Sequence, residues 1–265
     1  MRENWNRLKG RIFESKRSVL IDAFPQSAFR HLERDAIVCI DVIRATTTLV
    51  TSVAQGRPTF PVLDLEQALE LSSSLGSPLL ASDAQEELPK DLVIENSPSY
   101  LAHRPDTGRP LVLMSTPGTW LIANSAECPA VYIASLQNMS ATAEHIASHH
   151  TRVAILGAGL DGELRCEDQM TAARIAANLV ERGFESEDMR TTETLNRWTD
   201  SDVSLVGWGS SAEDLRSCGQ EDDLEFVLRH VDDLDLVCYY DRGQVKPLSF
   251  ETRAEPKATH AAYVE

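Results

Sequence analysis

Residues 36–48 read Ala36-Ile37-Val38-Cys39-Ile40-Asp41-Val42-Ile43-Arg44-Ala45-Thr46-Thr47-Thr48, an apolar run followed by a carboxylate, an arginine and three hydroxyls. The apolar residues before Asp41 do not alternate with polar ones, which predicts a strand covered on both faces, as in the interior of a parallel sheet. Open parallel sheets bind their ligands beyond the carboxyl ends of the strands. Asp41 and Arg44 are therefore candidate functional residues.

The three threonines lead into a predicted helix over residues 47–55, which ends at Gly56. They would act as N-cap and first-turn residues of that helix, and its free N–H groups would bind an anion. Asp41 would serve as a metal ligand or a nucleophile, and Arg44 would bind the anion. The alternative is a structural ion pair between Asp41 and Arg44 beside a capped helix.

The alternation of apolar strand, polar strand end and helix recurs along the chain and predicts an α/β fold. Predicted strands cover residues 18–23, 36–40, 60–63, 78–81, 92–94, 110–114, 130–134, 152–157 and 234–239. Further predicted helices cover residues 65–75, 120–125, 140–149, 167–182, 212–216 and 222–230. Residues 184–201 carry no clear pattern, and residues 202–209 fit a short strand or a loop.

The pattern divides the chain into a polar N-terminal extension (residues 1–17), an α/β domain (18–247) and a polar tail (248–265). A chain of 265 residues is long enough for one domain or for two smaller lobes. Two lobes that meet near residue 150 are therefore the alternative to a single domain.

Composition narrows the class of protein. The net charge of −16 argues against nucleic acid as a partner. No apolar run reaches the roughly 18 residues that a membrane span needs, and the first residues lack the apolar segment of a secretion signal. We expect a cytoplasmic enzyme or binding protein, for which a homodimer would be an ordinary assembly.

Two further patterns have simple structural explanations. Gly157, Gly159 and Gly162 formally match a dinucleotide-binding motif, but the segment that follows is polar, which favours a tight turn. His145 and His149 lie one helical turn apart, as two ligands of a transition metal would. No glutamate general base accompanies them, which favours a solvated helix face.

The adjacent carboxylates Glu167 and Asp168 begin a predicted helix, where the helix dipole stabilises negative charge. They either cap this helix or bind Mg²⁺, which takes a few carboxylate oxygens and keeps several waters. Cys166 precedes them, and their charges should raise the pKa of its thiol. We therefore do not expect Cys166 to be a nucleophile.

Three more strand ends place hydroxyl and amide groups beside free backbone N–H groups. They are Asn96-Ser97-Pro98, Ser115-Thr116-Pro117-Gly118-Thr119 and Ser135-Leu136-Gln137-Asn138. Each alone is typical of a turn or a helix cap. Together with Arg44 they would form an anion-binding site surrounded by carboxylates that hold Mg²⁺. That combination suits phosphoryl transfer or the hydrolysis of a phosphate ester.

Taken in order, the motifs at residues 40–48, 96–98, 115–119, 135–138 and 167–168 resemble the 2-phosphosulfolactate phosphatase (ComB) family. The resemblance runs from about residue 18 to residue 247. It implies a three-layer α/β/α sandwich around a largely parallel or mixed sheet. It also implies a Mg²⁺-dependent hydrolysis of 2-phospho-3-sulfolactate to 3-sulfolactate and phosphate, a step in one route of coenzyme M biosynthesis.

Two positions depart from the pattern of the family that the chain resembles. Pro117 stands where the family's T-N-G-T motif has asparagine, which removes a side-chain amide and a backbone N–H. Ser82 and Asp83 fall on the family's G-E pair, so that the carboxylate is shortened and the glycine is lost. Both departures concern the identity of the substrate more than the class of reaction.

The resulting hypothesis is a Mg²⁺-dependent phosphatase that acts on a small anionic phosphoester. The expected catalytic residues are Asp41, Arg44, Glu167 and Asp168. The expected metal ligands are Asp41, Asp83, Glu167 and Asp168. The expected substrate-binding residues are Thr46, Thr47, Asn96, Ser97, Ser115, Thr116, Gly118, Thr119 and Asn138. The alternatives are an altered relative that binds an anionic metabolite without hydrolysing it, and a phosphatase for another phosphorylated acid or sugar.

Overall fold

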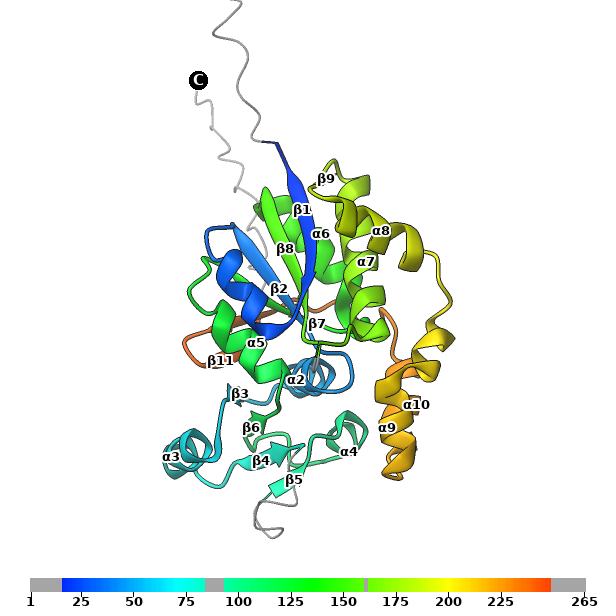
Figure 1. The fold of residues 1–265 in the computed structure, drawn as a ribbon. Coiled ribbons are helices and arrows are strands. Elements are labelled where there is room, and N and C mark those ends of the chain that lie inside the picture. Colours follow the sequence, from blue (N-terminus) through cyan, green and yellow to red (C-terminus); the bar gives the residue numbers. More distant parts are fainter. Residues whose placement is uncertain (1–15, 84–92, 160–161, 249–265) are drawn as a thin grey trace, which may run out of the picture.

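The computed structural model describes residues 16–83, 93–159 and 162–248, and within these ranges eleven strands form one mixed sheet between helices (Figure 1). The strands are β1 (Ser18–Ala23), β2 (Ala36–Ile40), β3 (Thr59–Val62), β4 (Leu79–Ser82), β5 (Val93–Glu95), β6 (Leu111–Met114), β7 (Val131–Ala134), β8 (Arg152–Gly157), β9 (Glu185–Ser186), β10 (Cys238–Asp241) and β11 (Gln244–Pro247). The α-helices are α2 (Ala45–Ala54), α3 (Leu65–Leu75), α4 (Pro98–Ala102), α5 (Gly118–Ser125), α6 (Met139–His149), α7 (Cys166–Glu181), α8 (Met189–Trp198), α9 (Ser210–Ser217) and α10 (Glu221–Arg229). The 3-10 helices are η1 (Pro25–Arg30), η3 (Leu136–Asn138) and η4 (Val203–Trp208).

The alternating side chains of β2 lie in two separate cores, because successive residues of a strand point to opposite faces of the sheet. Val38 and Ile40 pack in the cluster that contains residues of α6 and α7. Ile37 and Cys39 pack in the cluster that contains residues of α2 and α5. The strand is therefore covered on both faces, and the expected three-layer α/β/α arrangement is confirmed.

The sheet has the order β5-β4-β6-β3-β11-β10-β7-β2-β8-β1-β9. Strands β9, β1, β8, β2 and β7 run parallel to one another, as do β3, β6, β4 and β5. The antiparallel hairpin β10–β11 joins the two groups, which consequently run in opposite directions. In a flat sheet the carboxyl ends of the two groups would lie at opposite edges.

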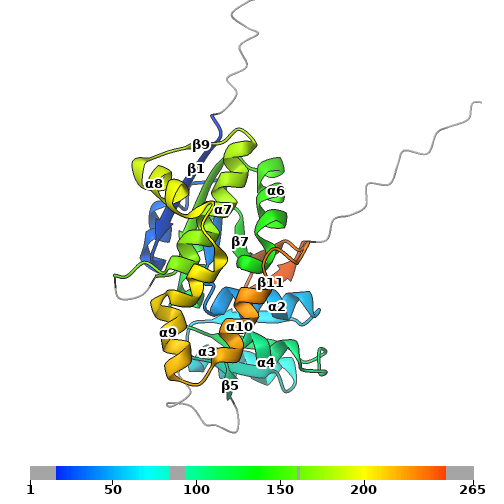
Figure 2. The same ribbon diagram turned by 90° about the vertical axis from the view of Figure 1, so that its right-hand side faces the viewer.

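The second group of strands does not continue a flat sheet. With α3 and α4 it forms a smaller lobe, residues 59–83 and 93–115, that lies beyond the carboxyl end of β2 (Figures 1 and 2). An ion pair between Arg44, after β2, and Asp83, after β4, joins the carboxyl ends of the two groups. The strand ends that the sequence analysis brought together do meet, although they meet across a bend in the sheet.

Strands before and after residue 150 are interleaved in this single sheet, because β8 lies between β1 and β2. The smaller lobe is instead an insertion between β2 and β7. Most of the predicted N-terminal extension and tail, and residues 84–87 of the acidic loop that follows Asp83, lie outside the described residues. Within the described ranges, no helix has both the length and the hydropathy needed to cross a bilayer.

Three predictions made from the pattern of apolar residues were wrong. The predicted strand over residues 234–239 lies at residues 238–241 and is followed by a second strand, β11, which the sequence analysis missed. Helix α8, in the segment without a clear pattern, was also missed. Helix α2 begins at Ala45 instead of Thr47, with Arg44 at its N-cap.

The predicted solvated histidine face was wrong for His145, which is only 7 % exposed, whereas His149 is exposed as predicted. The Nε2 of His145 lies 3.0 Å from the Tyr132 hydroxyl, and the ring stacks on that of His149 with 4.1 Å between centroids. Burial lowers the pKa of His145 to about 4. This histidine is a neutral core residue that links α6 to β7.

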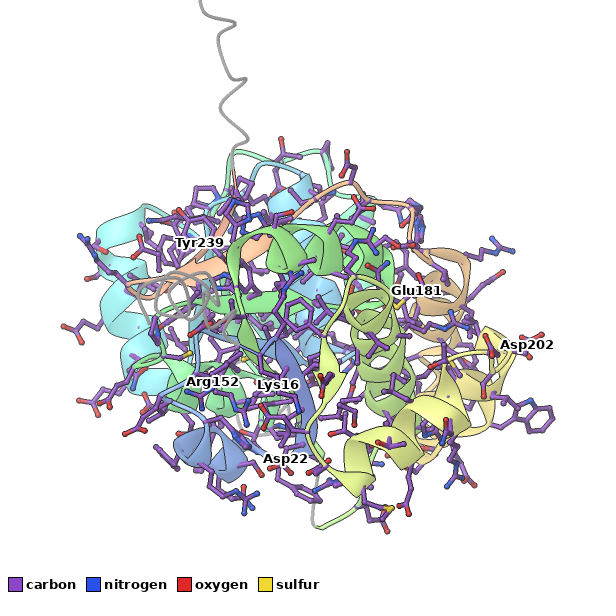
Figure 3. All side chains as sticks on the ribbon, turned by 90° about the horizontal axis from the view of Figure 1, so that it is seen from above. Lys16, Asp22, Arg152, Glu181, Asp202 and Tyr239 are labelled. Carbon is purple, nitrogen blue, oxygen red and sulfur yellow. The ribbon has the colours of Figure 1, made fainter. Side chains whose placement is uncertain are left out.

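A buried ion network joins η1 and α8 to β1. Asp22 lies between η1 and α8 (Figure 3) and pairs with Arg30, His31 and Arg190. Burial opposes ionisation of Asp22, but the hydrogen bonds from His31, from the Ala23 amide and from Arg30 outweigh it and lower its pKa. The network therefore favours the charged form of a carboxylate inside the fold.

A second pair extends this network. Both guanidinium nitrogens of Arg34 donate to the two carboxylate oxygens of Glu187, at 2.7 and 2.6 Å. These hydrogen bonds lower the pKa of Glu187 to about 2 from an ordinary value of 4.5. Because the folded pKa is the lower of the two, the pair stabilises the fold above pH 4.5 and loses its effect as pH falls toward 2.

We expect Glu187→Gln to lower the free energy of unfolding by about 1–2 kcal/mol at pH 7, allowing for solvent screening of this partly exposed pair. The difference from the wild type should shrink as pH falls below about 4.5. Urea unfolding followed by circular dichroism at pH 7, 5, 4 and 3 measures it. Glu193→Gln, on the exposed face of α8, is the control. A difference independent of pH would contradict the assignment.

Candidate functional site

A cavity of about 280 Å³ lies where the carboxyl end of β2 faces the smaller lobe. Six residues predicted from sequence line it: Asp41, Arg44, Asp83, Ser115, Thr116 and Asp168. Its other lining residues are Ile43, Pro117, Ala158, Gly159, Arg165, Ser211, Asp214, Leu215, Cys218 and Gln220. The structure thus brings acidic groups, two arginines and hydroxyls from distant parts of the chain around one small space.

The threonines after β2 shape the loop that presents Asp41. The Thr46 hydroxyl donates to the Asp41 carbonyl at 2.8 Å and accepts the Asp41 N–H at 3.0 Å. The Thr47 hydroxyl donates to the Val42 carbonyl at 2.6 Å. Both side chains are buried and neither lines the cavity. These hydroxyls, predicted to bind substrate, are engaged with the backbone.

Asp168 holds together the ends of two neighbouring strands. Its Oδ1 accepts the Val42 N–H at 2.9 Å, and its Oδ2 accepts the Ala158 N–H at 3.1 Å. Val42 follows β2 and Ala158 follows β8, so the carboxylate bridges the point where these strands separate. Asp168 also lies in the first turn of α7, where the helix dipole favours a negative charge.

The carboxylates at this edge repel one another. Burial, together with the charges of Asp83 and Glu167, raises the pKa of Asp41 to about 7. Burial and the charges of Asp41 and Glu167 also raise the pKa of Asp168. Carboxylates that are buried close together are stable only when a cation lies nearby or when some of them are protonated.

Glu167 is buried behind the cavity wall and does not line it. The Cys166 thiol donates to Glu167 Oε2 at 3.3 Å. Burial and the Glu167 charge raise the pKa of Cys166 to about 12. The predicted rise in the pKa of the Cys166 thiol is confirmed.

Arg44 is held by three acceptors. Its Nη1 donates to Gln220 Oε1 at 2.8 Å and to Asp223 Oδ2 at 3.0 Å. Its Nη2 donates to Asp83 Oδ1 at 3.3 Å. The alternative interpretation, a structural ion pair between Arg44 and Asp41, is wrong, because Arg44 forms its ion pairs with Asp83 and Asp223. A guanidinium has five N–H groups, so the Nε–H and one Nη2–H remain to bind an anion.

Asp83 and its neighbours form the wall contributed by the smaller lobe. The Ser115 hydroxyl donates to Asp83 Oδ2, and Asn96 Nδ2 donates to Asp83 Oδ1 at 2.9 Å. Asn96 Oδ1 is buried and has no hydrogen-bond partner in the part of the chain that the structure describes. A buried amide oxygen without a donor is an acceptor available to a cation or a water.

Asp223 connects Arg44 to the segment after β5. Its Oδ1 accepts hydrogen bonds from the Ser97 hydroxyl at 2.7 Å and from the Ser99 N–H at 3.0 Å. Ser97 also caps α4, accepting the Tyr100 N–H at 3.1 Å. Ser97, predicted to contact substrate, therefore positions α4 and Asp223 instead of lining the cavity.

The remaining predicted residues lie around the site or away from it. The Thr119 hydroxyl donates to the Ser115 carbonyl at 2.9 Å inside α5. Asn138 is engaged with Ser135 and with the carbonyls of Ile133 and Leu236, away from the cavity lining. A Cβ at Gly118 would come within 2.4 Å of Asp41 Oδ2, so glycine is required there for Asp41 to keep its place.

The glycine motif after β8 makes a turn at the cavity wall. Gly159 lines the cavity and has φ of 52°, a conformation that glycine adopts readily. The helix begins at Cys166, after Gly162, and not within the glycine motif. This arrangement matches the tight turn that the sequence favoured over a dinucleotide site.

The cavity lining includes Ser211 and Asp214, which were not predicted from the sequence. Three further polar residues at this site were also not predicted: Arg165, Gln220 and Asp223. They precede α7 or lie at the start of α10, and no motif marks them. Their positions follow from tertiary packing, because α10 packs against both α4 and α9 (Figure 2). Of these residues, only Arg165 could have been suspected from the sequence, because it is a cation close to the two candidate metal ligands Glu167 and Asp168.

No group of three or more His, Cys, Asp or Glu side chains in the described ranges is arranged to hold a metal ion. The four carboxylates predicted as ligands therefore do not converge on one point as their side chains stand. Asp168 has both oxygens bound to backbone N–H groups, and Glu167 lies behind the wall. Asp41 and Asp83 are the two predicted ligands that line the cavity without being bound in this way.

A family model described as 2-phosphosulpholactate phosphatase matches residues 23–243 of this chain. A protein of Symbiobacterium thermophilum named probable 2-phosphosulfolactate phosphatase is 31% identical over 215 residues, which cover 78% of this chain and 92% of that protein. Proteins with the same name from Caldanaerobacter subterraneus and Thermotoga maritima are 27% and 31% identical. These matches cover 82% and 73% of this chain, and 92% and 83% of the respective relatives.

We expect Asp223→Ala to lower the free energy of unfolding by about 2–4 kcal/mol, because it leaves Arg44, Ser97 and Ser99 without a buried acceptor. Urea unfolding measures the change. Asp222→Ala is a matched control, since Asp222 is the exposed preceding residue on the same helix. Equal stability of the two variants would contradict the role of Asp223 as the link between α10, α4 and Arg44.

Proposed function

Because this chain belongs to the 2-phosphosulpholactate phosphatase family, we propose that it hydrolyses the phosphate ester of 2-phospho-3-sulfolactate with the help of Mg²⁺. The products are 3-sulfolactate and inorganic phosphate. The observation that carries the proposal is the cavity at the end of β2, where Asp41, Arg44 and Asp83 meet within a chain that the family model matches over most of its length. A cavity of about 280 Å³ suits a small substrate.

Arg44 is the residue that would bind the phosphate. Its charge-assisted N–H groups recognise phosphate oxygens. Two of its five N–H groups point away from the three acceptors that hold it, and the side chain is only 10 % exposed. The anchored guanidinium loses little conformational entropy when the anion binds, and the low exposure strengthens the attraction. The Thr116 hydroxyl, at the cavity wall, is a further donor.

Asp41 and Asp83 would hold the Mg²⁺, with Asn96 Oδ1 as a further oxygen beside Asp83. Mg²⁺ in proteins is commonly bound through one or two carboxylates, with the remaining positions filled by water and substrate phosphate. The raised pKa of Asp41 fits this role, since its neighbours crowd negative charge that a cation would neutralise. When bound, Mg²⁺ neutralises phosphate charge and lowers the pKa of the attacking water.

Asp41 has two roles open to it, and one experiment separates them. As a ligand it orients the reacting groups, and as a nucleophile its carboxylate attacks phosphorus and forms an aspartyl phosphate. Acid quenching of the enzyme during turnover, followed by mass spectrometry, detects phosphate on Asp41 in the second case. We propose the ligand role, because the Asp41 carboxylate is pressed against Gly118 and is crowded by Asp83.

Identifying the substrate requires a panel of phosphate esters, because Pro117 lines the cavity and contributes no backbone N–H. We expect phosphate release from 2-phosphosulfolactate at a rate above that from other phosphorylated acids and sugars. EDTA should abolish release, and added Mg²⁺ should restore it. Hydrolysis of another ester in preference would identify a retargeted phosphatase. Binding of 3-sulfolactate without hydrolysis of any ester would identify the non-catalytic relative.

We expect Asp41→Asn and Arg44→Ala each to lower phosphate release by about a hundredfold or more, as the loss of one transition-state contact does in other enzymes. Asp235→Asn, an exposed position away from the cavity, is the control. A malachite-green assay measures release, and circular dichroism checks that each variant is folded. Near-normal turnover in either variant would overturn the site.

A further inference from the structure

Two arginines face the cavity, and their surroundings differ. Arg44 lies after β2, and Arg165 lies at the N-cap of α7 on another side of the wall. Arg44 is paired with the carboxylates of Asp83 and Asp223. Its positive charge is therefore largely balanced before any ligand enters.

Arg165 has a neutral partner instead. Its Nη1 donates to the Ser210 hydroxyl, at the first residue of α9. Within residues 16–83, 93–159 and 162–248, no carboxylate lies within ion-pairing distance of its guanidinium. The hydrogen bond to Ser210 fixes the direction of the side chain and uses one of its five N–H groups. The other N–H groups are left for a ligand.

The rest of the cavity wall is acidic. Asp41, Asp83, Asp168 and Asp214 line it, and the chain as a whole carries a net charge of −16. An anionic ligand needs a compensating cation at each of its charged groups, because the local dielectric is low. Arg44 and a metal ion would serve a phosphate. A second acidic group of the same ligand would need Arg165.

We propose that Arg165 binds a second acidic group of the substrate, a sulfonate or a carboxylate, while its phosphate lies at Arg44. The inference rests on the proposed function, since it assumes that a phosphoester with more than one anionic group occupies this cavity. Ser211 and Leu215 also line the cavity, and they belong to α9, whose first residue, Ser210, accepts the hydrogen bond from Arg165. They give this subsite a hydroxyl donor and an apolar wall that suits the carbon chain of a small acid.

The subsite explains how the protein would distinguish its ester from simpler ones. Phosphate binding alone is common to all phosphomonoesters. A planar guanidinium placed at a fixed distance from Arg44 selects esters that carry a second anion at the matching distance. Removing such a charge-assisted contact weakens binding of the group it holds and leaves binding of inorganic phosphate almost unchanged.

Isothermal titration calorimetry on the full chain tests the proposal with 3-sulfolactate and with inorganic phosphate as ligands. Arg165→Met should weaken 3-sulfolactate binding by about 10- to 100-fold and change phosphate binding by less than about twofold. Arg165→Lys should lie between this variant and the wild type. Arg174→Met is the matched control, because Arg174 lies on α7, donates a hydrogen bond to the Ser201 carbonyl and does not line this cavity.

Two smaller ligands assign the group that Arg165 binds. Isethionate carries a sulfonate without a carboxylate, and lactate carries a carboxylate without a sulfonate. The ligand whose binding Arg165→Met weakens identifies the group. Equal weakening of 3-sulfolactate and phosphate, unchanged 3-sulfolactate binding in Arg165→Met, or no binding of 3-sulfolactate to the wild type would each overturn the subsite.

Hydrolysis of 2-phosphosulfolactate by the same preparations reports separately on the proposed function. Selective loss of 3-sulfolactate binding in Arg165→Met, combined with no phosphate release by the wild type, would overturn the proposed hydrolysis and support the subsite. Phosphate release by the wild type that is equally fast in Arg165→Met, with unchanged KM, would support the hydrolysis and overturn the subsite.

Discussion

The carboxylate of Asp168 bridges the backbone N–H groups of Val42 and Ala158, and the site depends on this contact. Where β2 and β8 separate, the Val42 N–H donates to Asp168, and buried N–H groups without acceptors are costly. The Ala158 N–H donates to the Ile40 carbonyl at 2.8 Å and also to Asp168 at 3.1 Å, so that one side chain from the first turn of α7 contacts both strand ends. The same contact therefore closes the sheet, fixes the start of a helix and opens the crevice beside Asp41.

This arrangement concentrates negative charge at the carboxyl end of β2. Arginines balance part of this charge, and residues outside the sheet hold them in place. Burial and the neighbouring carboxylates raise the pKa of Asp41 and of Asp168, which favours a proton or a cation beside each of them. Arg44 compensates part of this charge because Asp223, on α10, holds it against the wall. Helix α10 thus contributes to the charge balance at Arg44 through a residue 179 positions later in the chain.

Sequence reasoning predicted the parts of the site that depend on local pattern. The buried strand before Asp41, the acidic pair at 167–168 and the polar end at Ser115 follow from hydrophobic runs and strand–helix alternation. The structure places Asp41, Asp168 and Ser115 at one cavity, with Glu167 behind its wall. Gln220 and Asp223 could not be predicted, because their role is set by how α10 docks on α4. Thr46 and Thr47 were predicted to bind substrate, because the sequence does not show whether a hydroxyl near a helix start contacts a ligand or the backbone. In the structure, their hydroxyls donate to the backbone carbonyls of the turn after β2. Strand β11 was missed because its residues, Gln244–Pro247, are polar or broken by proline, and only pairing in the hairpin makes them a strand.

The site contains two kinds of groups, and they lie in different parts of the fold. The groups that we propose to act on the phosphate lie at strand ends, where the backbone is fixed by the sheet and by Asp168. The groups that we propose to select among esters, Arg165 and the residues near Pro117, lie on connections between elements. A proline in place of a backbone donor and an arginine with a neutral partner can therefore alter which ester fits while the strand ends keep the reaction class. Contacts within the fold determine the charge balance at Asp41, Arg44 and Asp83. Fewer contacts constrain Arg165 and the residues near Pro117, which line another part of the cavity.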